Sequence, residues 1–371
     1  MRGNDVVRQN PGLRFARSGL LVVATRYEKR TMTVMRSYAA VAAGLVAALM
    51  ALPALAAGAE DFYKGKTVSL IIGYSVGGGY DAYGRLVARH LGKHIPGNPS
   101  VVPQNMTGAG SLKAANYLYS VAPKDGSVIG TFSRSQGIAP LIDKAEFDST
   151  KFSWLGSVTD EVSLCVTRHD APTKNFSELL STPATFGGEG AGSDPNIFAL
   201  LYRNVFGARI KLVNGYPGTN EIQLATERGE VDGLCGLSWS TLKGRYPHWL
   251  TGRKANILVQ AGIRKQLELP DVPSASELAS TPDQVQIVKL ILIGQAMARP
   301  FAAPPGIPAD RKAALVAAFE RTTADPDFLA EAQRMNLEVN SVDAGKLDAL
   351  LADAYATPKD VIAKAAKAMA D

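Results

Sequence analysis

The first part of the chain alternates short apolar runs with segments of helical periodicity. Residues 67–73 form an apolar run that predicts a buried strand, and residues 81–94 repeat apolar side chains at helical spacing. The alternation continues with a strand over 100–104, a helix over 111–121 and a strand over 127–132. Strands and helices at this spacing predict a parallel sheet with right-handed crossovers.

A second stretch of the same kind begins after Trp154. The pattern predicts strands over 162–167, 184–186 and 211–213, and helices over 175–180, 195–206 and 219–228. Four helices are expected at the end of the chain, over 308–323, 327–335, 343–354 and 358–370. Such helices usually pack on a sheet that is already built, so the chain of 371 residues is predicted to be an α/β protein of two domains.

The first 59 residues differ from the rest and predict a cleaved leader. Arg36 precedes an apolar run over 39–52, and small residues follow Pro53, which is the pattern of a secretory signal peptide. The run of about 14 residues is shorter than the roughly 20 that a membrane-spanning helix needs. Export to the periplasm is therefore expected, with Met32 or Met35 as the more natural start.

Setting the leader aside changes the charge of the chain. The sequence holds 40 Lys and Arg against 34 Asp and Glu. Residues 1–59 contain eight of the basic and two of the acidic side chains, which leaves 32 of each in the remainder. A neutral protein lacks the electrostatic footprint of a nucleic-acid binder, so no nucleic-acid partner is expected.

Cys165 and Cys235 are the only two cysteines. In an oxidising compartment they either pair or stay as two buried or solitary thiols, and the sequence leaves both alternatives open. No C-x-x-C spacing or Cys/His cluster is present, which argues against structural zinc. His90 and His94 could share a helix face, but no third ligand is evident, so no metal is expected.

The most informative segment is the glycine-rich loop over 73–81, which joins the first strand to the first helix. Gly77, Gly78 and Gly79 allow backbone N–H groups to turn toward one point, and the following helix adds the positive end of its dipole. Such a loop can receive an anion at the sheet edge where open α/β sheets bind ligands.

A second loop, over 186–195, has the same place before a helix, with Ser193 or Asp194 as the expected cap. Two such loops, one in each domain, predict a ligand that is held from both sides. The alternative is that both are simply tight turns, capped by Asp81 and Asp194.

Residues 73–77 also fit the G-x-S-x-G elbow of hydrolases, with Ser75 as nucleophile and Asp232 and His248 in the order of a triad. An elbow places its serine directly at the helix start, whereas three glycines intervene here. An enzyme that uses Ser75 as nucleophile, or Asp81 or Asp194 as base, is therefore the less favoured alternative. The relaxed dinucleotide-binding spacing in this loop lacks the acid that would hold a ribose. No catalytic residue and no cofactor are expected.

Five ordered motifs give the chain a family likeness. They are residues 71–81, 101–111 (Val-Val-Pro-Gln-Asn-Met-Thr-Gly-Ala-Gly-Ser), 122–126 (Ala-Pro-Lys-Asp-Gly), 216–220 (Tyr-Pro-Gly-Thr-Asn) and 229–232 (Gly-Glu-Val-Asp). In this order and spacing they resemble the substrate-binding proteins of tripartite tricarboxylate transporters, also called Bug receptors. The resemblance covers nearly the whole chain after the leader.

The resemblance implies a Venus-flytrap fold like that of type II periplasmic binding proteins, with two α/β domains, mainly parallel sheets and crossing hinge strands. We place the crossings near 162–167 and 292–299, with domain 1 over 60–164 and 296–371 and domain 2 inserted over 165–295. Carboxylate capture by backbone amides and bridging water at the two loops is also implied. Carried over to this sequence, the ligand-binding residues would be Tyr74, Ser75, Gly77, Gly78, Gly79, Asp81, Ser133, Arg134, Ser135, Gly190, Ser193, Asp194, Tyr216, Gly218, Thr219 and Asn220.

Two positions depart from the family pattern. Val76 and Thr107 stand where the family commonly has proline, so their loops lose a fixed φ. Arg134 either pairs with a ligand carboxylate in a bidentate manner or forms a salt bridge at the cleft rim. The ligand stays open among citrate-like acids, other dicarboxylates, aromatic acids and amino acids. Aromatic side chains near the cleft either favour a flat ligand or pack its wall, and they are Tyr74, Tyr80, Tyr216 and Trp239.

The function that the resemblance implies is solute binding in the periplasm. The receptor would deliver a small carboxylated metabolite to the membrane permease subunits of a tripartite transporter, which would recognise the closed form. It is expected to act as a monomer. The alternative is a sensor subunit that uses the same clamp to report to a signalling kinase, and only the partner separates the two.

Overall fold

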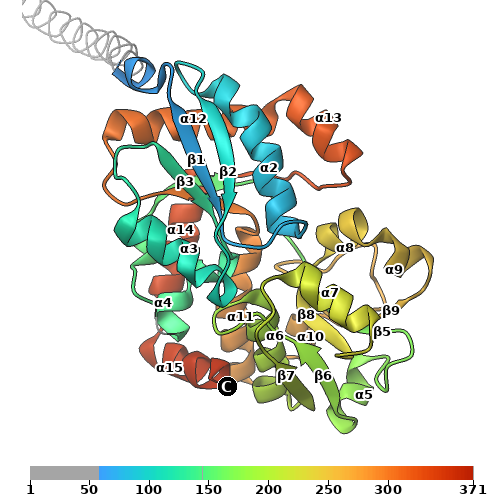
Figure 1. The fold of residues 1–371 in the computed structure, drawn as a ribbon. Helices are drawn as coiled ribbons and strands as arrows, with labels where there is room; N and C mark the ends of the chain where they lie inside the picture. The colour runs from blue at the N-terminus through green and yellow to red at the C-terminus, as the bar shows by residue number, and fades with distance from the viewer. Residues whose placement is uncertain (1–57, 144, 371) are drawn as a thin grey trace, which may run out of the picture. The chain divides into compact units, whose positions relative to one another are not determined.

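The computed structural model describes residues 58–143 and 145–370, so the predicted signal peptide lies almost wholly outside the described residues. The described chain forms two β-sheets, each with helices on both faces (Figure 1). In this part of the chain, no helix is both long enough and apolar enough to cross a membrane.

The first sheet and its helices form lobe 1. The strand order is β11-β4-β10-β3-β1-β2, with β1 (Thr67–Ile72), β2 (Ser100–Asn105), β3 (Val128–Thr131), β4 (Ser153–Ser157), β10 (Pro300–Ala303) and β11 (Val342–Asp343). The helices are α2 (Gly79–Leu91), α3 (Leu112–Asn116), α4 (Ala139–Ile142), α12 (Ala309–Ala324), α13 (Pro326–Arg334) and α14 (Ala344–Tyr355). Alternation along β1 sends Leu70 and Ile72 into a core with α2, α12 and α13, and Ile71 into a core with α3 and α14.

The second sheet and its helices form lobe 2. The strand order is β7-β6-β8-β5-β9, with β5 (Ser163–Arg168), β6 (Ala184–Gly187), β7 (Ile210–Val213), β8 (Gly233–Ser238) and β9 (Ala255–Ala261). The helices are α5 (Phe176–Ser181), α6 (Asp194–Leu200), α7 (Thr219–Glu227), α8 (Trp239–Arg245), α9 (Pro247–Thr251), α10 (Ala275–Leu278) and α11 (Pro282–Ala296). Phe186 and Leu258 pack with α6 and α11, whereas Leu164 and Leu234 pack with α7, α8 and α9.

Both sheets are mixed, which corrects the expectation of mainly parallel sheets. The strands β1, β2 and β3 are parallel in lobe 1, as are β6, β7 and β8 in lobe 2. The pairs that involve β10 or β5 are antiparallel. The sequence pattern detected five of these six parallel strands but not β8, and it could not show the direction of the strands through which the chain leaves and re-enters a lobe.

The chain crosses between the lobes twice, over residues 158–162 and 297–299. The two crossings bond to each other, from the Val158 amide to the Arg299 carbonyl at 3.1 Å and from the Ala298 amide to the Thr159 carbonyl at 3.1 Å. The second crossing was predicted as a strand from 292, but residues 292–296 end helix α11 instead. A capping box of Thr281 and Gln284 starts that helix. A short buried apolar run can belong to a helix or to a strand, and periodicity alone does not distinguish the two.

The C-terminal helices divide between two environments. Helices α12 and α14 contact β4, and α13 packs on α2, so these three return to lobe 1. Helix α15 (Lys359–Met369) instead packs on α4 and α11, where Ala365 is fully buried. The last helix therefore does not lie on the lobe 1 sheet, where all four helices were expected.

The two histidines at the end of α2 and in the turn after it have structural partners. His90 lies 2.6 Å from the carboxylate of Glu331 on α13, and His94 lies 2.6 Å from that of Asp325, which caps α13. These contacts join the two helices. Among residues 58–143 and 145–370, no cluster of three or more His, Cys, Asp or Glu side chains is arranged to hold a metal ion.

The two cysteines form a disulfide between neighbouring strands of lobe 2. Cys165 on β5 and Cys235 on β8 are bonded, and both are fully buried. The strands are antiparallel, and their register shifts between Leu164 and Val166. Of the two alternatives left open by the sequence, the structure has the paired one.

Candidate functional site

The glycine-rich loops of the two lobes reach one small cavity between them. Its volume is about 20 Å³, which suits about one water molecule. The cavity is lined by Tyr74, Gly79 and Tyr80 of lobe 1, by Arg299 of the crossing, and by Glu189, Asp194, Pro195, Thr219, Gly236, Leu237, Ser238 and Thr241 of lobe 2. Four of the predicted residues, Tyr74, Gly79, Asp194 and Thr219, are among them.

The first loop is held in shape by Asp81. Gly77 has a φ of +96°, which favours glycine, and its amide donates to the Asp81 carboxylate at 3.0 Å. Asn105 donates to the same carboxylate and to the Tyr74 carbonyl, both at 2.8 Å. Burial raises the pKa of Asp81, but hydrogen bonds from Arg85, Asn105 and the Gly77 amide outweigh it and leave the pKa lower than usual. Asp81 therefore acts within its own lobe, and Gly78 is buried at the start of α2.

The second loop is organised by Asn196 of α6. Its side-chain oxygen accepts hydrogen bonds from the amides of Glu189 at 3.0 Å and Gly190 at 3.1 Å. Ser193 caps α6, because its hydroxyl accepts from the Asn196 amide. The amides of Gly77, Glu189 and Gly190 thus already have side-chain partners, which leaves fewer amides of the two loops to receive an anion.

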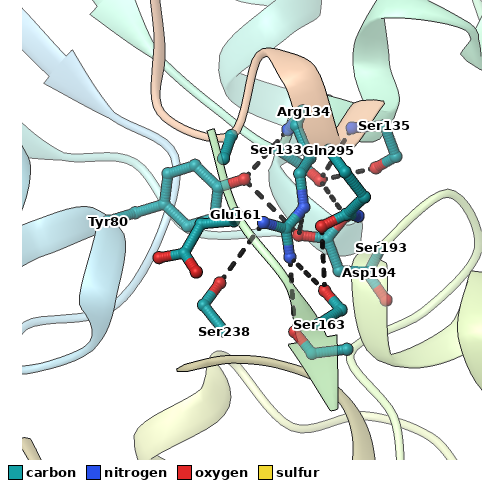
Figure 2. Close-up of polar contacts among 12 residues, drawn as sticks. Tyr80, Ser133, Arg134, Ser135, Glu161, Ser163, Ser193, Asp194, Ser238 and Gln295 are labelled. Atoms are coloured by element: carbon teal, nitrogen blue, oxygen red, sulfur yellow. Dashed lines mark hydrogen bonds and ion pairs between the residues drawn. The ribbon is translucent and has the colours of Figure 1, made fainter. Parts of the chain in front are cut away.

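Arg134 is the most densely bonded residue of the site. It belongs to the predicted segment 133–135, and its side chain lies between the lobes (Figure 2). Its Nε lies 3.1 Å from the Asp194 carboxylate, and both side chains are buried. Its terminal nitrogens donate to the hydroxyls of Ser163 at 2.7 Å and Ser238 at 3.3 Å. Burial opposes its charge, but Asp194 outweighs this and holds the pKa of Arg134 above the usual value. The salt bridge is real but buried, rather than at the rim.

Lobe 1 supplies three further contacts to Asp194 and its loop (Figure 2). The hydroxyl of Tyr80 donates to the Asp194 carboxylate at 3.4 Å, and that of Ser133 at 3.2 Å. Ser135 donates to the Gly192 carbonyl at 2.5 Å. Asp194 is therefore the point of lobe 2 that lobe 1 grips most closely.

The outer part of the first loop also contacts lobe 2. Ser75 donates to the Glu221 carboxylate at 2.9 Å, and Arg245 donates to the Gly77 carbonyl at 3.0 Å. A Cβ atom on Gly218 would lie only 2.4 Å from the Ser75 hydroxyl, so the loops meet there without space. Asn220 lies beside Gly77, and Tyr216 is half-buried among the apolar side chains of α7 to α9.

The hydrolase alternative does not have its triad. Ser75 bonds to Glu221, Asp232 accepts from the Thr185 amide at 2.8 Å, and His248 lies 2.7 Å from Glu227. The three residues bond to different partners on different elements. The geometry therefore gives Ser75 no histidine base.

Several cavity residues were not among the predicted site residues. Glu189 lies in the second glycine-rich loop, where the glycines drew the prediction and the acid did not. Ser238 and Thr241 end β8 and begin α8, elements that the apolar pattern did not detect. Arg299 lies in the crossing, and its guanidinium stacks 4.6 Å from the ring centre of Tyr80. Glu189 and Arg299 belong to no sequence motif, so no signal in the sequence indicated that they line the site.

Glu189 and Arg299, which both line the cavity, have opposite electrostatic surroundings. Burial and the neighbouring Asp194 raise the pKa of Glu189 to about 8. Arg299 lies 3.8 Å from Glu161 in the crossing region, and burial raises the pKa of that carboxyl. Burial also raises the pKa of Tyr80 to about 12 and that of Tyr74 well above its usual value, so both tyrosines are neutral hydrogen-bonding groups.

Comparisons with known proteins support the fold. No protein-family model matches the chain. A protein described as "UPF0065 protein in the TAR-I ttuE-ttuC' intergenic region" of Agrobacterium vitis is 29% identical over 234 residues. These residues are 59% of this chain and 63% of that relative, so the match spans less than two thirds of the relative's length. The periplasmic binding protein BugD has a TM-score of 0.63 and 19% identity, with 82% of this chain and 97% of that chain covered.

A second solved structure agrees. MatC of Rhodopseudomonas palustris, described with bound malate, has a TM-score of 0.62 and 22% identity, with 82% of this chain and 99% of that chain covered. Both structures share the fold of type II periplasmic binding proteins with this chain. The fold expected from the motifs, and the resemblance to Bug receptors that implied it, are therefore confirmed.

Proposed function

We propose that this chain, which resembles the Bug receptors in its motifs and its fold, is a periplasmic solute-binding protein that captures a small carboxylated metabolite between its lobes. One observation carries the proposal: the loops at the heads of α2 and α6, one from each lobe, reach the same buried cavity. The malate described in MatC supports the ligand class. Ligands of such proteins bind where a few polar groups converge in a closed pocket.

Binding requires the lobes to separate first. A cavity of about 20 Å³ has no room for a metabolite of several carbon atoms. We assign the hinge to the paired crossings over 158–162 and 297–299. The moving bodies then differ by a few residues from the predicted domains, 60–164 with 296–371 and 165–295, because β5 of lobe 2 begins at Ser163 and α11 of lobe 2 ends at Ala296. Tyr74, Gly79, Asp194 and Thr219 would contact the ligand, whereas the other predicted residues would shape the loops or close the lobes.

Delivery follows from the same motion. The membrane permease subunits of a tripartite transporter would recognise the closed form, because closure brings surfaces of both lobes together. The receptor would act in the periplasm as a monomer and without a cofactor, because the clamp needs no chemistry beyond binding.

We expect a carboxylate to raise the stability of the protein. A ligand at about 100 times its dissociation constant adds about 2.7 kcal/mol to the free energy of unfolding, because it binds only the folded chain. Thermal-shift measurements of the exported protein against a carboxylate library would find it. A shift with a neutral or cationic solute, and with no carboxylate, would contradict the proposal.

We expect Gly218→Leu to weaken binding of the carboxylate found in that screen by about tenfold or more, since a loss of 1.4 kcal/mol in closure is already a factor of ten. Gly218 has an extended backbone that any residue adopts, but its side chain would point at Ser75 across the interface. The variant should fold and stay open, which small-angle scattering would show as a larger radius of gyration.

Gly345→Leu is the matched control, because Gly345 is exposed on α14 and a Cβ there meets no tight contact. It should bind like the natural protein. Unchanged affinity and radius in Gly218→Leu would show that the lobes do not close at this contact.

A further inference from the structure

We infer that the ligand carries a protonated amine as well as a carboxylate, and that Glu189 binds the amine while Arg299 binds the carboxylate. The inference rests on the proposed function, because it names the ligand class of the same cavity. It starts from two polar atoms that the closed protein leaves without partners.

Glu189 is the first of these groups. It is 6% exposed and lines the cavity, and its Oε1 accepts a hydrogen bond from Thr219 at 3.1 Å. Its Oε2 is buried and has no hydrogen-bond partner. Within the described residues Glu189 forms no ion pair, and its charged neighbours Asp194 and Glu221 are both acidic. This end of the cavity therefore presents an acceptor in a negative field, which suits a cationic donor.

Arg299 is the second group. It is 2% exposed, and its terminal nitrogens donate to the Ala298 carbonyl and the Thr241 hydroxyl, both at 3.0 Å. Its Nε is buried and has no hydrogen-bond partner. Glu161 lies 3.8 Å away, at a distance that leaves the guanidinium only partly compensated. This side of the cavity therefore presents an unmatched donor with a positive charge.

The other charged pair at the cavity is already satisfied. Arg134 and Asp194 are in contact at 3.1 Å, and Arg134 also bonds to two serines. A dicarboxylate without an amine would place negative charge near Glu189, Asp194 and Glu221. An α-amino acid would satisfy Oε2 of Glu189 with its ammonium and Nε of Arg299 with its carboxylate, since buried polar groups without partners are costly.

The raised pKa of Glu189 gives the inference a second signature. Burial and the neighbouring Asp194 raise that pKa to about 8, so the carboxylate form that would accept hydrogen bonds from the ammonium group is disfavoured near neutral pH until a cation lies beside it. The titratable groups that face it are Asp194 of α6, Glu221 of α7, Tyr74 of the first loop and Tyr246 between α8 and α9. An ammonium group stabilises the carboxylate form, so its binding lowers that pKa and releases a proton.

Isothermal titration calorimetry with matched pairs tests the inference. The probes are alanine and propionate, aspartate and succinate, glutamate and glutarate, and phenylalanine and 3-phenylpropionate. In at least one pair the amino acid should bind about tenfold more tightly than its deaminated partner, and Glu189→Gln should remove that preference, because the neutral amide cannot form a charge-assisted hydrogen bond with the ammonium group. Titrations in buffers of different ionisation enthalpy should show proton release with the natural protein and none with Glu189→Gln.

Glu230→Gln is the control, because Glu230 is an exposed acid of the same lobe that does not line the cavity. It should keep the preference and the proton release. A deaminated acid that binds as tightly as its amino acid in every pair, or a preference that survives in Glu189→Gln, would overturn the inference and leave the proposed function standing. If no probe binds, the inference also fails, and the proposed function fails with it only if the wider carboxylate screen is silent too.

Discussion

Arg134→Met is expected to hold the protein open. In the closed form the substitution leaves the buried Asp194 carboxylate without the cation that lies 3.1 Å from it. Removal of one partner of a buried ion pair costs about 3–5 kcal/mol, which corresponds to a loss of closure by roughly two to four orders of magnitude. Separation of the lobes exposes Asp194 to water and relieves that cost. Small-angle scattering should therefore show a larger radius of gyration, and carboxylates that shift the natural protein should bind correspondingly less tightly.

The double variant Arg134→Met/Asp194→Asn separates charge from packing. It removes both charges, so most of the closure lost in Arg134→Met should return. Lys364→Met is the matched control for an ion pair, because Lys364 and Asp283 are 2.7 Å apart but exposed. Such exposed pairs contribute about 1 kcal/mol or less, so the control should stay closed. A closed Arg134→Met variant would contradict a clamping role of the pair.

Local sequence patterns were sufficient for the elements around the first loop. The predicted strand over 67–73 and helix over 81–94 correspond to β1 (Thr67–Ile72) and α2 (Gly79–Leu91), which a short 3₁₀ turn extends to His94. The alternation of Leu70, Ile71 and Ile72 and the glycines between strand and helix are local signals. The structure confirms the strand and the helix that these two signals predicted, because the burial of each residue follows from its own strand or helix.

The elements that close lobe 2 depend on long-range pairing and were not predicted. Strand β8 contains Gly233 and Gly236, and a Cβ at Gly233 would lie 2.0 Å from the Val166 carbonyl. Gly233 lets β8 approach β5 closely, and Gly236 lets it approach the start of α6 at Asp194 and Pro195. Neither contact can be read from a local stretch of sequence. The same holds for the loop chemistry, since only the fold shows that Asp81 accepts from the Gly77 amide and that Asn196 accepts from the Glu189 and Gly190 amides.

The pairing of the two cysteines also depends on contacts between distant parts of the sequence, and we expect its loss to have a large effect on the free energy of unfolding. Replacement of both Cys165 and Cys235 by alanine is expected to lower the free energy of unfolding by about 2–4 kcal/mol. The disulfide joins residues 70 apart in sequence, so its loss frees a long loop of the unfolded chain. Urea denaturation of the natural and double-alanine proteins under non-reducing conditions would measure the difference.

Reduction of the natural protein separates the covalent link from the loss of the sulfur atoms. Reduced natural protein should lose most of the same free energy, because both cysteines stay in the core and only the cross-link is removed. Carboxylate affinity should be nearly unchanged in both cases, since Cys165 and Cys235 lie within lobe 2 and do not line the cavity. Equal unfolding free energies for the oxidised, reduced and double-alanine proteins would mean that the bond does not stabilise lobe 2. A large loss of affinity without loss of stability would instead mean that the bond acts on the clamp.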